Sequence, residues 1–222
     1  LEDDSEHLFE GFVDLPQKQG EAMEAGEFMP VAAEQGLVGK IDRWVVLNAM
    51  RAAAAMSEPV KLVFNINGGS LADASLADWL LKAMRAAKMD GSRLTFQLTE
   101  GDATTYLKQA KEFTRGLREL HCKVSISRFG CALNPFNTLK HLEVDYLKVD
   151  GSFMKEIASE ESKEALKEMV AAAHAQGKLT IAPFVESAAI LSTLWQIGVN
   201  YIQGYYLQAP TEQMNYDFSS DE

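Results

Sequence analysis

The chain has 222 residues, of which 47% are hydrophobic and 24% are charged, a balance typical of a soluble globular chain with a sizeable core. That length favours one domain over two. The formal net charge of −11 disfavours nucleic-acid polymers and anionic membranes as partners, since both are bound through clustered Lys and Arg, but it leaves room for a small anionic ligand that responds to its local pocket.

Apolar patterns predict helices and strands in alternation. The first pair is a helix over 42–56, which stops before Pro59, and a β-rich strand over 61–66, which stops before the Gly68-Gly69 pair. Further helices are predicted over 76–87, 104–120, 163–175 and 188–197, and further strands over 93–98, 123–126, 146–149, 179–184 and 200–202. Such alternation predicts a parallel sheet covered by helices.

Periodicity alone does not decide whether this sheet is open and doubly wound or closed into a barrel. Neither G-x-G-x-x-G nor G-x-x-x-x-G-K-[ST] occurs, which weakens the nucleotide-binding open sheets and favours a barrel. In a barrel the functional side chains lie at the carboxyl ends of the strands. These ends are Asn65, Gln97 to Glu100, Ser127-Arg128, Lys148 to Asp150, Pro183 to Glu186, and Gln203-Gly204.

Three stretches resemble, in order, motifs of the EAL family of cyclic di-GMP phosphodiesterases. Residues 26–44 are similar to GEFIPLAEETGLI-IDRW, residues 142–153 to LPVDYLKIDRSF, and residues 201–210 to YVQGYLFSRP. The resemblance runs from Phe9 to Pro210 and implies a TIM-like (β/α)8 barrel over 1–212. The remaining residues, 213–222, are acidic and are expected to form a mobile tail. Since family members carry a helix and a strand before the position of Leu1, it also implies truncation at the N-terminus and other domains in a longer parent protein.

The motifs that carry the family's chemistry are altered. The name-giving Glu-Ala-Leu reads Glu10-Gly11-Phe12. Three carboxylates of the family's metal cluster and its presumed general base are replaced, at Gln97, Ser127, Arg128 and Pro183. Retained from the family's site are Glu10, Asn65, Lys148 and Asp150.

These replacements predict that hydrolysis fails. Two divalent ions activate water in this family, and hard cations need several oxygen ligands at once. Arg128 would repel a dication by roughly 8 kcal/mol at about 4 Å and an effective dielectric of about 20. Loss of the base removes a further contribution of about 10² to 10⁴-fold. We therefore expect no metal, no other cofactor and no catalytic residue.

Binding of cyclic di-GMP is still expected, because a pocket with fewer carboxylates suits a dianion. Asp42 and Glu186 are candidates to hold guanine edges, and Phe12 and Phe184 to stack on the bases. The remaining candidate ligand contacts are Asn65, Arg128, Gln203 and Pro210. Simpler interpretations also stand: a first-turn helix carboxylate for Asp42, core packing for the two phenylalanines, and a structural ion pair of Arg128 with Glu10 or Asp150.

The E-G-F, R-F-G and P-F-V-E-S variants together resemble the FimX-type branch of the family. Members of this branch bind cyclic di-GMP without useful turnover and dock a PilZ-family adaptor, which implies a role in type IV pilus assembly and twitching motility. The resemblance implies a cytoplasmic receptor at the cell pole, and free thiols at Cys122 and Cys131 agree with a reducing compartment. The alternatives are a weakly active metal-dependent phosphodiesterase and a protein scaffold that binds no nucleotide.

Overall fold

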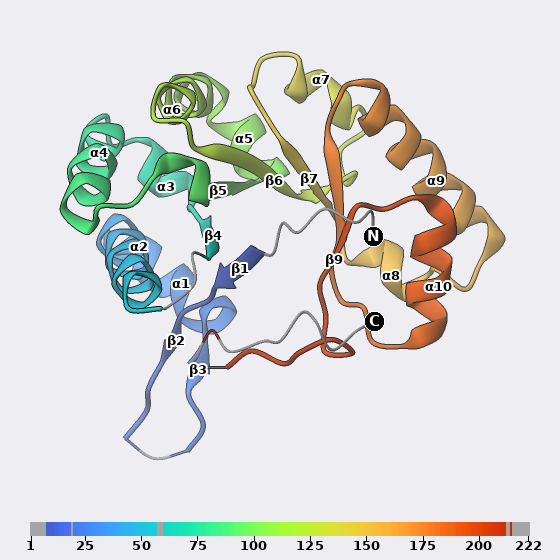
Figure 1. Ribbon diagram of the computed structural model, residues 1–222, viewed down its shortest axis with the longest axis horizontal. Helices are drawn as coiled ribbons and strands as arrows, with labels where there is room; N and C mark the ends of the chain where they lie inside the picture. Colours follow the sequence, from blue (N-terminus) through green and yellow to red (C-terminus); the bar gives the residue numbers. More distant parts are fainter. Residues whose placement is uncertain (1–7, 19, 57–59, 212–213, 215–222) are drawn as a thin grey trace.

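A curled parallel sheet is the centre of the molecule. The computed structural model describes residues 8–18, 20–56, 60–211 and 214. Seven strands follow one another across the sheet in chain order. They are β1 (Leu8–Gly11), β4 (Lys61–Asn65), β5 (Leu94–Thr99), β6 (Lys123–Phe129), β7 (Tyr146–Val149), β8 (Leu179–Ala182) and β9 (Tyr201–Ile202). In the described part of the chain β1 and β9 are the two edges, so this sheet is an open half-barrel (Figure 1).

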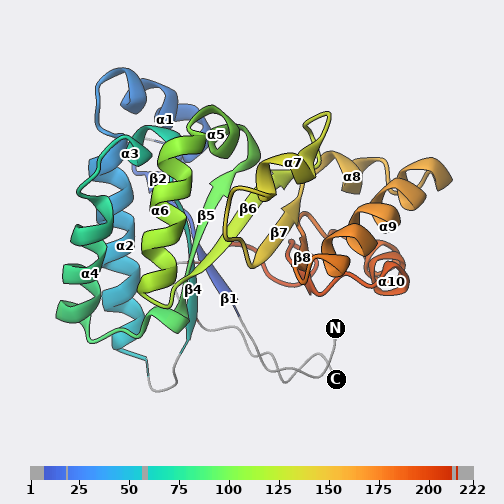
Figure 2. The same cartoon turned by 90° about the horizontal axis from the view of Figure 1, so that it is seen from above.

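The longer helices cover the convex face of the sheet. They are α2 (Val38–Ala54), α4 (Leu76–Ala87), α6 (Leu107–Glu119), α9 (Glu160–Ala175) and α10 (Ala188–Ile197), which form an outer arc in Figure 1. Figure 2 shows α2, α4 and α6 side by side on that face. Helix α4 buries Leu76, Leu80, Ala83 and Met84, the spacing of one helix face. The predicted helix-covered parallel sheet is therefore confirmed.

Short elements fill the loops. The helices α3 (Gly68–Leu71), α5 (Glu100–Thr105), α7 (Pro135–Leu139) and α8 (Ser152–Lys155) each follow the carboxyl end of a strand, and η1 (Gly91–Arg93) precedes β5. The antiparallel hairpin of β2 (Asp14–Leu15) and β3 (Met23–Glu24) leads into α1 (Ala25–Glu34). Figure 1 shows this hairpin projecting away from the sheet.

Two hydrophobic clusters hold the strands in place. The larger one includes Phe64, Phe96 and Phe113, whose rings meet at centroid distances of 5.5 Å and 6.2 Å. The smaller one lies under α9 and α10 and includes Leu166 and Leu194. Each such side chain contributes about 1.5–3 kcal/mol on burial, so the strand ends rest on a well-packed base.

Several boundaries differ from those predicted. The helix predicted over 104–120 is divided into α5 and α6, because Tyr106 (φ −110°, ψ 40°) leaves the helical conformation. Strand β8 ends at Ala182, since Phe184 has a positive φ of 56°. Strand β1, the hairpin and α1 were not predicted. The strands are too short for a clear period, and α1 contains Pro30, which normally interrupts a helical pattern. The predicted domain end at 212 and the tail 213–222 fall outside the described residues except for Met214.

Within those described ranges, no helix combines the length and the apolar character needed to cross a membrane.

Candidate functional site

The carboxyl ends of the parallel strands form one rim, and five of the predicted site residues meet there. Glu10 lies on β1, Asn65 ends β4, Gln97 lies on β5, Lys148 lies on β7, and Gln203 follows β9. Asn65 and Gln97 are partners in the register of β4 and β5. The sheet topology thus brings together side chains that are up to 193 residues apart in sequence.

Glu10 is the centre of this group. Its Oε1 accepts hydrogen bonds from Asn65 Nδ2 at 2.9 Å and from Gln97 Nε2 at 3.0 Å. Its Oε2 accepts from Lys148 Nζ at 2.6 Å and from Gln203 Nε2 at 2.8 Å. Four nitrogen donors from four different segments therefore surround one carboxylate, which we call the Glu10 network. The bond from Gln203 also links the two open edges of the sheet.

The Glu10 carboxylate is ionised at neutral pH. Burial, the largest single influence, raises its pKa, but the charge of Lys148 and the hydrogen bonds from Lys148, Asn65 and Gln203 together hold the pKa below its ordinary value of 4.5. The side chains of Glu10 and Lys148 are only 8% and 12% exposed. This pair is a shielded ion pair in which each carboxylate oxygen of Glu10 accepts two hydrogen bonds.

Gln97 connects the network to the next strand. Its Nε2 donates to Glu10 and also to Asn65 Oδ1 at 2.7 Å, and its Oε1 accepts from Ser125 Oγ at 2.9 Å. Ser125 was not predicted, although strand alternation from Ser127 places both on one face. A carboxylate at position 97 has no hydrogen to donate to Glu10, so this arrangement requires the amide.

Arg128 and Asp150 form a second, more open pair. Arg128 lies at a register shift between β6 and β7 and has a φ of 53°. Its Nε is 3.8 Å from Asp150 Oδ2, and its side chain is 76% exposed. Burial raises the pKa of Asp150, but hydrogen bonds from Ser152 and Cys131 and the charge of Arg128 bring that pKa below its ordinary value. Of the two structural partners considered for Arg128, the structure selects Asp150.

Two aromatic side chains are largely exposed near this rim. Phe12, just after β1, is 58% exposed, and Phe184, just after β8, is 61% exposed. Neither is a core residue, so the packing interpretation is wrong for both. Glu186 and Pro210 are exposed as well. Stacking on a base and contact with a guanine edge stay predictions for these four residues.

Asp42 is in a different environment, because it lies on α2 and is only 4% exposed. Its Oδ2 accepts from the backbone of Asn67 at 3.0 Å and from Ser70 Oγ at 2.6 Å, and its Oδ1 accepts from Asn67 Nδ2 at 2.7 Å. Burial raises its pKa despite these bonds. Asp42 thus ties α2 to α3, and its predicted role toward a ligand stays a prediction.

The last two predicted positions are internal. Ser127 is 8% exposed, with its Oγ 3.4 Å from the carbonyl oxygen of Leu98. Pro183 is buried directly after β8. Neither offers an ionisable group to the rim.

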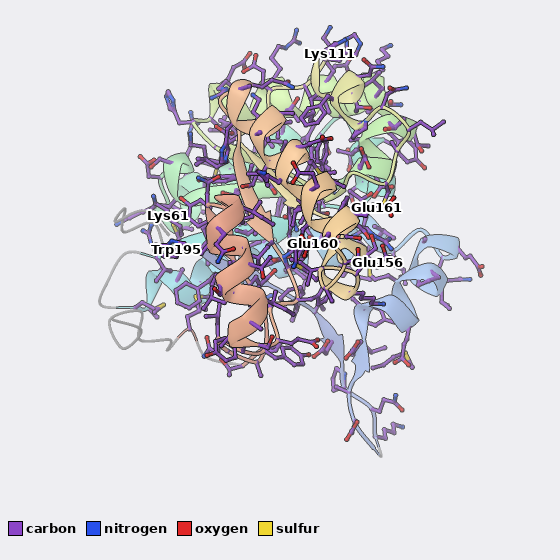
Figure 3. All side chains as sticks on the ribbon, turned by 90° about the vertical axis from the view of Figure 1, so that its right-hand side faces the viewer. Lys61, Lys111, Glu156, Glu160, Glu161 and Trp195 are labelled. Atoms are coloured by element: carbon purple, nitrogen blue, oxygen red, sulfur yellow. The ribbon has the colours of Figure 1, made fainter. Side chains whose placement is uncertain are left out.

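A hollow of about 700 Å³ lies beside the Arg128–Asp150 pair, lined by Gly130, Cys131, Ser152, Glu156 and Glu161 among others. Figure 3 shows Glu156, Glu160 and Glu161 close together near the start of α9, with Trp195 on the neighbouring α10. The carboxylates make this hollow unfavourable for an anion.

The family is decided by a match that extends along nearly the whole chain. A model of the EAL domain matches residues 1–210. The chain belongs to the EAL domain family. The predicted EAL-type fold is confirmed by the same match and by the structural neighbours below.

Solved EAL domains with bound nucleotide are similar to this one. The FimX EAL domain from Pseudomonas aeruginosa bound to c-di-GMP has 49% identity and a TM-score of 0.94, over 98% of this chain and 89% of that chain. The FimX EAL domain from Xanthomonas citri in complex with c-di-GMP has 32% identity and a TM-score of 0.89, over 95% of this chain and 85% of that chain.

Two of the similar curated relatives bear the names of enzymes. Cyclic di-GMP phosphodiesterase PdeF from Escherichia coli is 29% identical over 194 residues, which cover 86% of this chain and 26% of PdeF. Cyclic di-GMP phosphodiesterase PdeB from Shewanella oneidensis is 27% identical over 201 residues, which cover 89% of this chain and 24% of PdeB. This EAL domain therefore spans about a quarter of the length of these relatives.

Proposed function

We propose that this EAL domain is a receptor that binds cyclic di-GMP without a metal ion and does not hydrolyse it. The observation that carries the proposal is the Glu10 network. The family resemblance assigns the Glu10 carboxylate to metal binding. In this structure both of its oxygens accept hydrogen bonds from nitrogen donors. Similarity to two FimX EAL domains solved with c-di-GMP supports the choice of ligand.

The side chains at the rim do not fit a divalent cation. A dication at Glu10 would have to displace Asn65, Gln97 or Gln203 and would lie close to the ammonium group of Lys148. Repulsion between charges of +1 and +2 is roughly 8 kcal/mol at about 4 Å and an effective dielectric of about 20. In the described ranges, no group of three or more His, Cys, Asp or Glu side chains is placed to hold a metal ion.

The same features favour a dianionic ligand. Lys148 balances the charge of Glu10, and the Arg128 guanidinium extends into solvent at the end of β6. Each phosphate of the ligand can accept hydrogen bonds from a guanidinium. Phe12 and Phe184 present open aromatic faces for the bases, and such stacking contributes about 1–3 kcal/mol per base.

Equilibrium dialysis of labelled cyclic di-GMP, followed by chromatography of the nucleotide, separates this proposal from its alternatives. We expect the protein to retain intact ligand in Mg²⁺ or Mn²⁺, with no linear dinucleotide. Linear product that disappears in Glu10→Ala would establish a phosphodiesterase instead. If the protein neither retains the ligand nor forms linear product, only the protein-scaffold alternative remains.

As the output of the receptor, we propose contact with a PilZ-family adaptor at the cell pole, acting on type IV pilus assembly and twitching motility. This part of the proposal rests on the similarity to FimX EAL domains. A pull-down from cells with the tagged protein tests it, with Glu10→Ala run in parallel. If the captured material contains no PilZ protein, the proposed contact with an adaptor is refuted.

A further inference from the structure

Two bulky side chains at the rim have unusual backbone conformations. In the described part of the chain, the residues other than glycine with positive φ are Lys88, His121, Arg128 and Phe184. Lys88 caps α4 and His121 follows the end of α6, where left-handed residues are common. Arg128 and Phe184 instead lie at the ends of β6 and β8. Strained residues away from helix ends cluster at binding sites, which makes this pair informative.

Both side chains rest on the end of β7, the strand between them. Arg128 approaches the carboxylate of Asp150. The edge of the Phe184 ring lies against Gly151, because a Cβ added to Gly151 would be 2.5 Å from Phe184 Cε2 and 2.6 Å from Cδ2 but 3.8 Å from Cζ. The ring can occupy this place only because Gly151 has no side chain. The EAL motif L-P-V-D-Y-L-K-I-D-R-S-F has arginine at this position.

The backbone on both sides of the ring is held independently. Before Phe184, the carbonyl oxygen of Ala182 accepts a hydrogen bond from Gln203 N at 2.9 Å, and after it Val185 N donates to the carbonyl oxygen of Gln203 at 2.9 Å. A change at Gly151 therefore moves the ring and leaves the strand end in place. Only the edge of the ring contacts Gly151, and with 61% of Phe184 exposed the ring is open to a ligand.

We propose that Gly151 is a positioning residue of the nucleotide pocket, which acts by giving the Phe184 ring its place against the end of β7. The missing side chain lets the edge of the Phe184 ring lie against the strand end, which leaves the ring exposed for stacking on a purine base. This inference rests on the proposed function, and it adds a residue that touches no ligand itself.

Affinity for cyclic di-GMP in EDTA, measured by calorimetry, tests the inference with Gly151→Ala, Phe184→Ala and the double variant. We expect each single variant to weaken binding about tenfold or more, the loss of one base-stacking contact. The double variant should bind no more weakly than Phe184→Ala, since Gly151 acts only through that ring. Gly26→Ala is the matched control, because a Cβ there meets no atom within 4 Å. Unchanged binding by Gly151→Ala, or losses that multiply in the double variant, would overturn the inference.

A second measurement needs no ligand. The Cα of Gly151 faces the edge of the Phe184 ring, so the NMR signal of the Hα proton that points at this edge should be shifted downfield and should return toward its ordinary value in Phe184→Ala. Absence of this shift in the folded wild-type protein refutes the placement, whether or not Gly151→Ala folds. Failure of the wild-type protein to bind cyclic di-GMP would instead refute the proposed function, while the NMR result still reports on the ring.

Discussion

At the scale of single residues, Lys148 is the only charged donor to Glu10 among the four that the structure places around it. Removing one member of a buried ion pair leaves an uncompensated charge, which costs about 3–5 kcal/mol. We expect Lys148→Met to lower the free energy of unfolding by about that amount at pH 7, measured by urea denaturation. Lys167→Met, which removes a surface pair with a 60% exposed lysine, should cost under about 1 kcal/mol.

The pH dependence of stability follows from the same pair. Because the folded pKa of Glu10 is below 4.5, its contribution in the wild-type protein is present above that pH and is lost as the pH falls through the folded value. In Lys148→Met, the charge and the hydrogen bond of Lys148 no longer oppose the effect of burial, so the pKa of Glu10 rises. The cost of the substitution should therefore shrink between pH 7 and pH 4. A cost that is equal at both values would show that the charge of Glu10 is not involved.

Residue identities at the rim could be taken from the sequence, since each altered motif letter falls at a strand end. The exposure of these side chains and their hydrogen-bond partners could not be taken from the sequence. Nothing in the linear pattern distinguishes Asp42, buried against Asn67 and Ser70, from a carboxylate that faces a ligand. Ser125 was missed because a single buried serine in a strand is an ordinary core residue until its acceptor on Gln97 is known.

At the scale of elements, Gln97 joins β5 to β1, β4 and β6 through one amide. Gln97→Glu replaces a donor by a second carboxylate beside Glu10. We expect the free energy of unfolding at pH 7 to fall by about 2–4 kcal/mol, from the lost donor and the like-charge repulsion. Chemical denaturation in EDTA measures it, and Gln176→Glu at the exposed end of α9 is the control. If Gln97→Glu is as stable as the wild-type protein, the amide does not hold the strands together.

The predicted strand and helix alternation is confirmed from α2 onward, because buried strands and amphipathic helices of ordinary length have clear periods. The errors occur where a single residue decides an end. Tyr106 interrupts a helical pattern without proline or glycine, and Phe184 leaves the β region although its sequence is typical of a strand. Such departures depend on tertiary contacts that local propensity does not contain.

At the scale of the whole molecule, a chain of net charge −11 is proposed to hold a dianion. The two are compatible because the charges are unevenly distributed. Carboxylates gather near the start of α9 (Figure 3). The rim carries Lys148 and Arg128. The bond between Glu10 and Gln203 joins the open edges of the sheet at that rim. Ligand binding therefore depends on side chains fixed by the entire sheet.

The most direct test of this account is the dissociation constant for cyclic di-GMP, measured by isothermal titration calorimetry first in excess EDTA and then in Mg²⁺ or Mn²⁺. A pocket whose central carboxylate is already satisfied by nitrogen donors should bind equally well in both solutions. Binding that appears only when the divalent cation is added would contradict it.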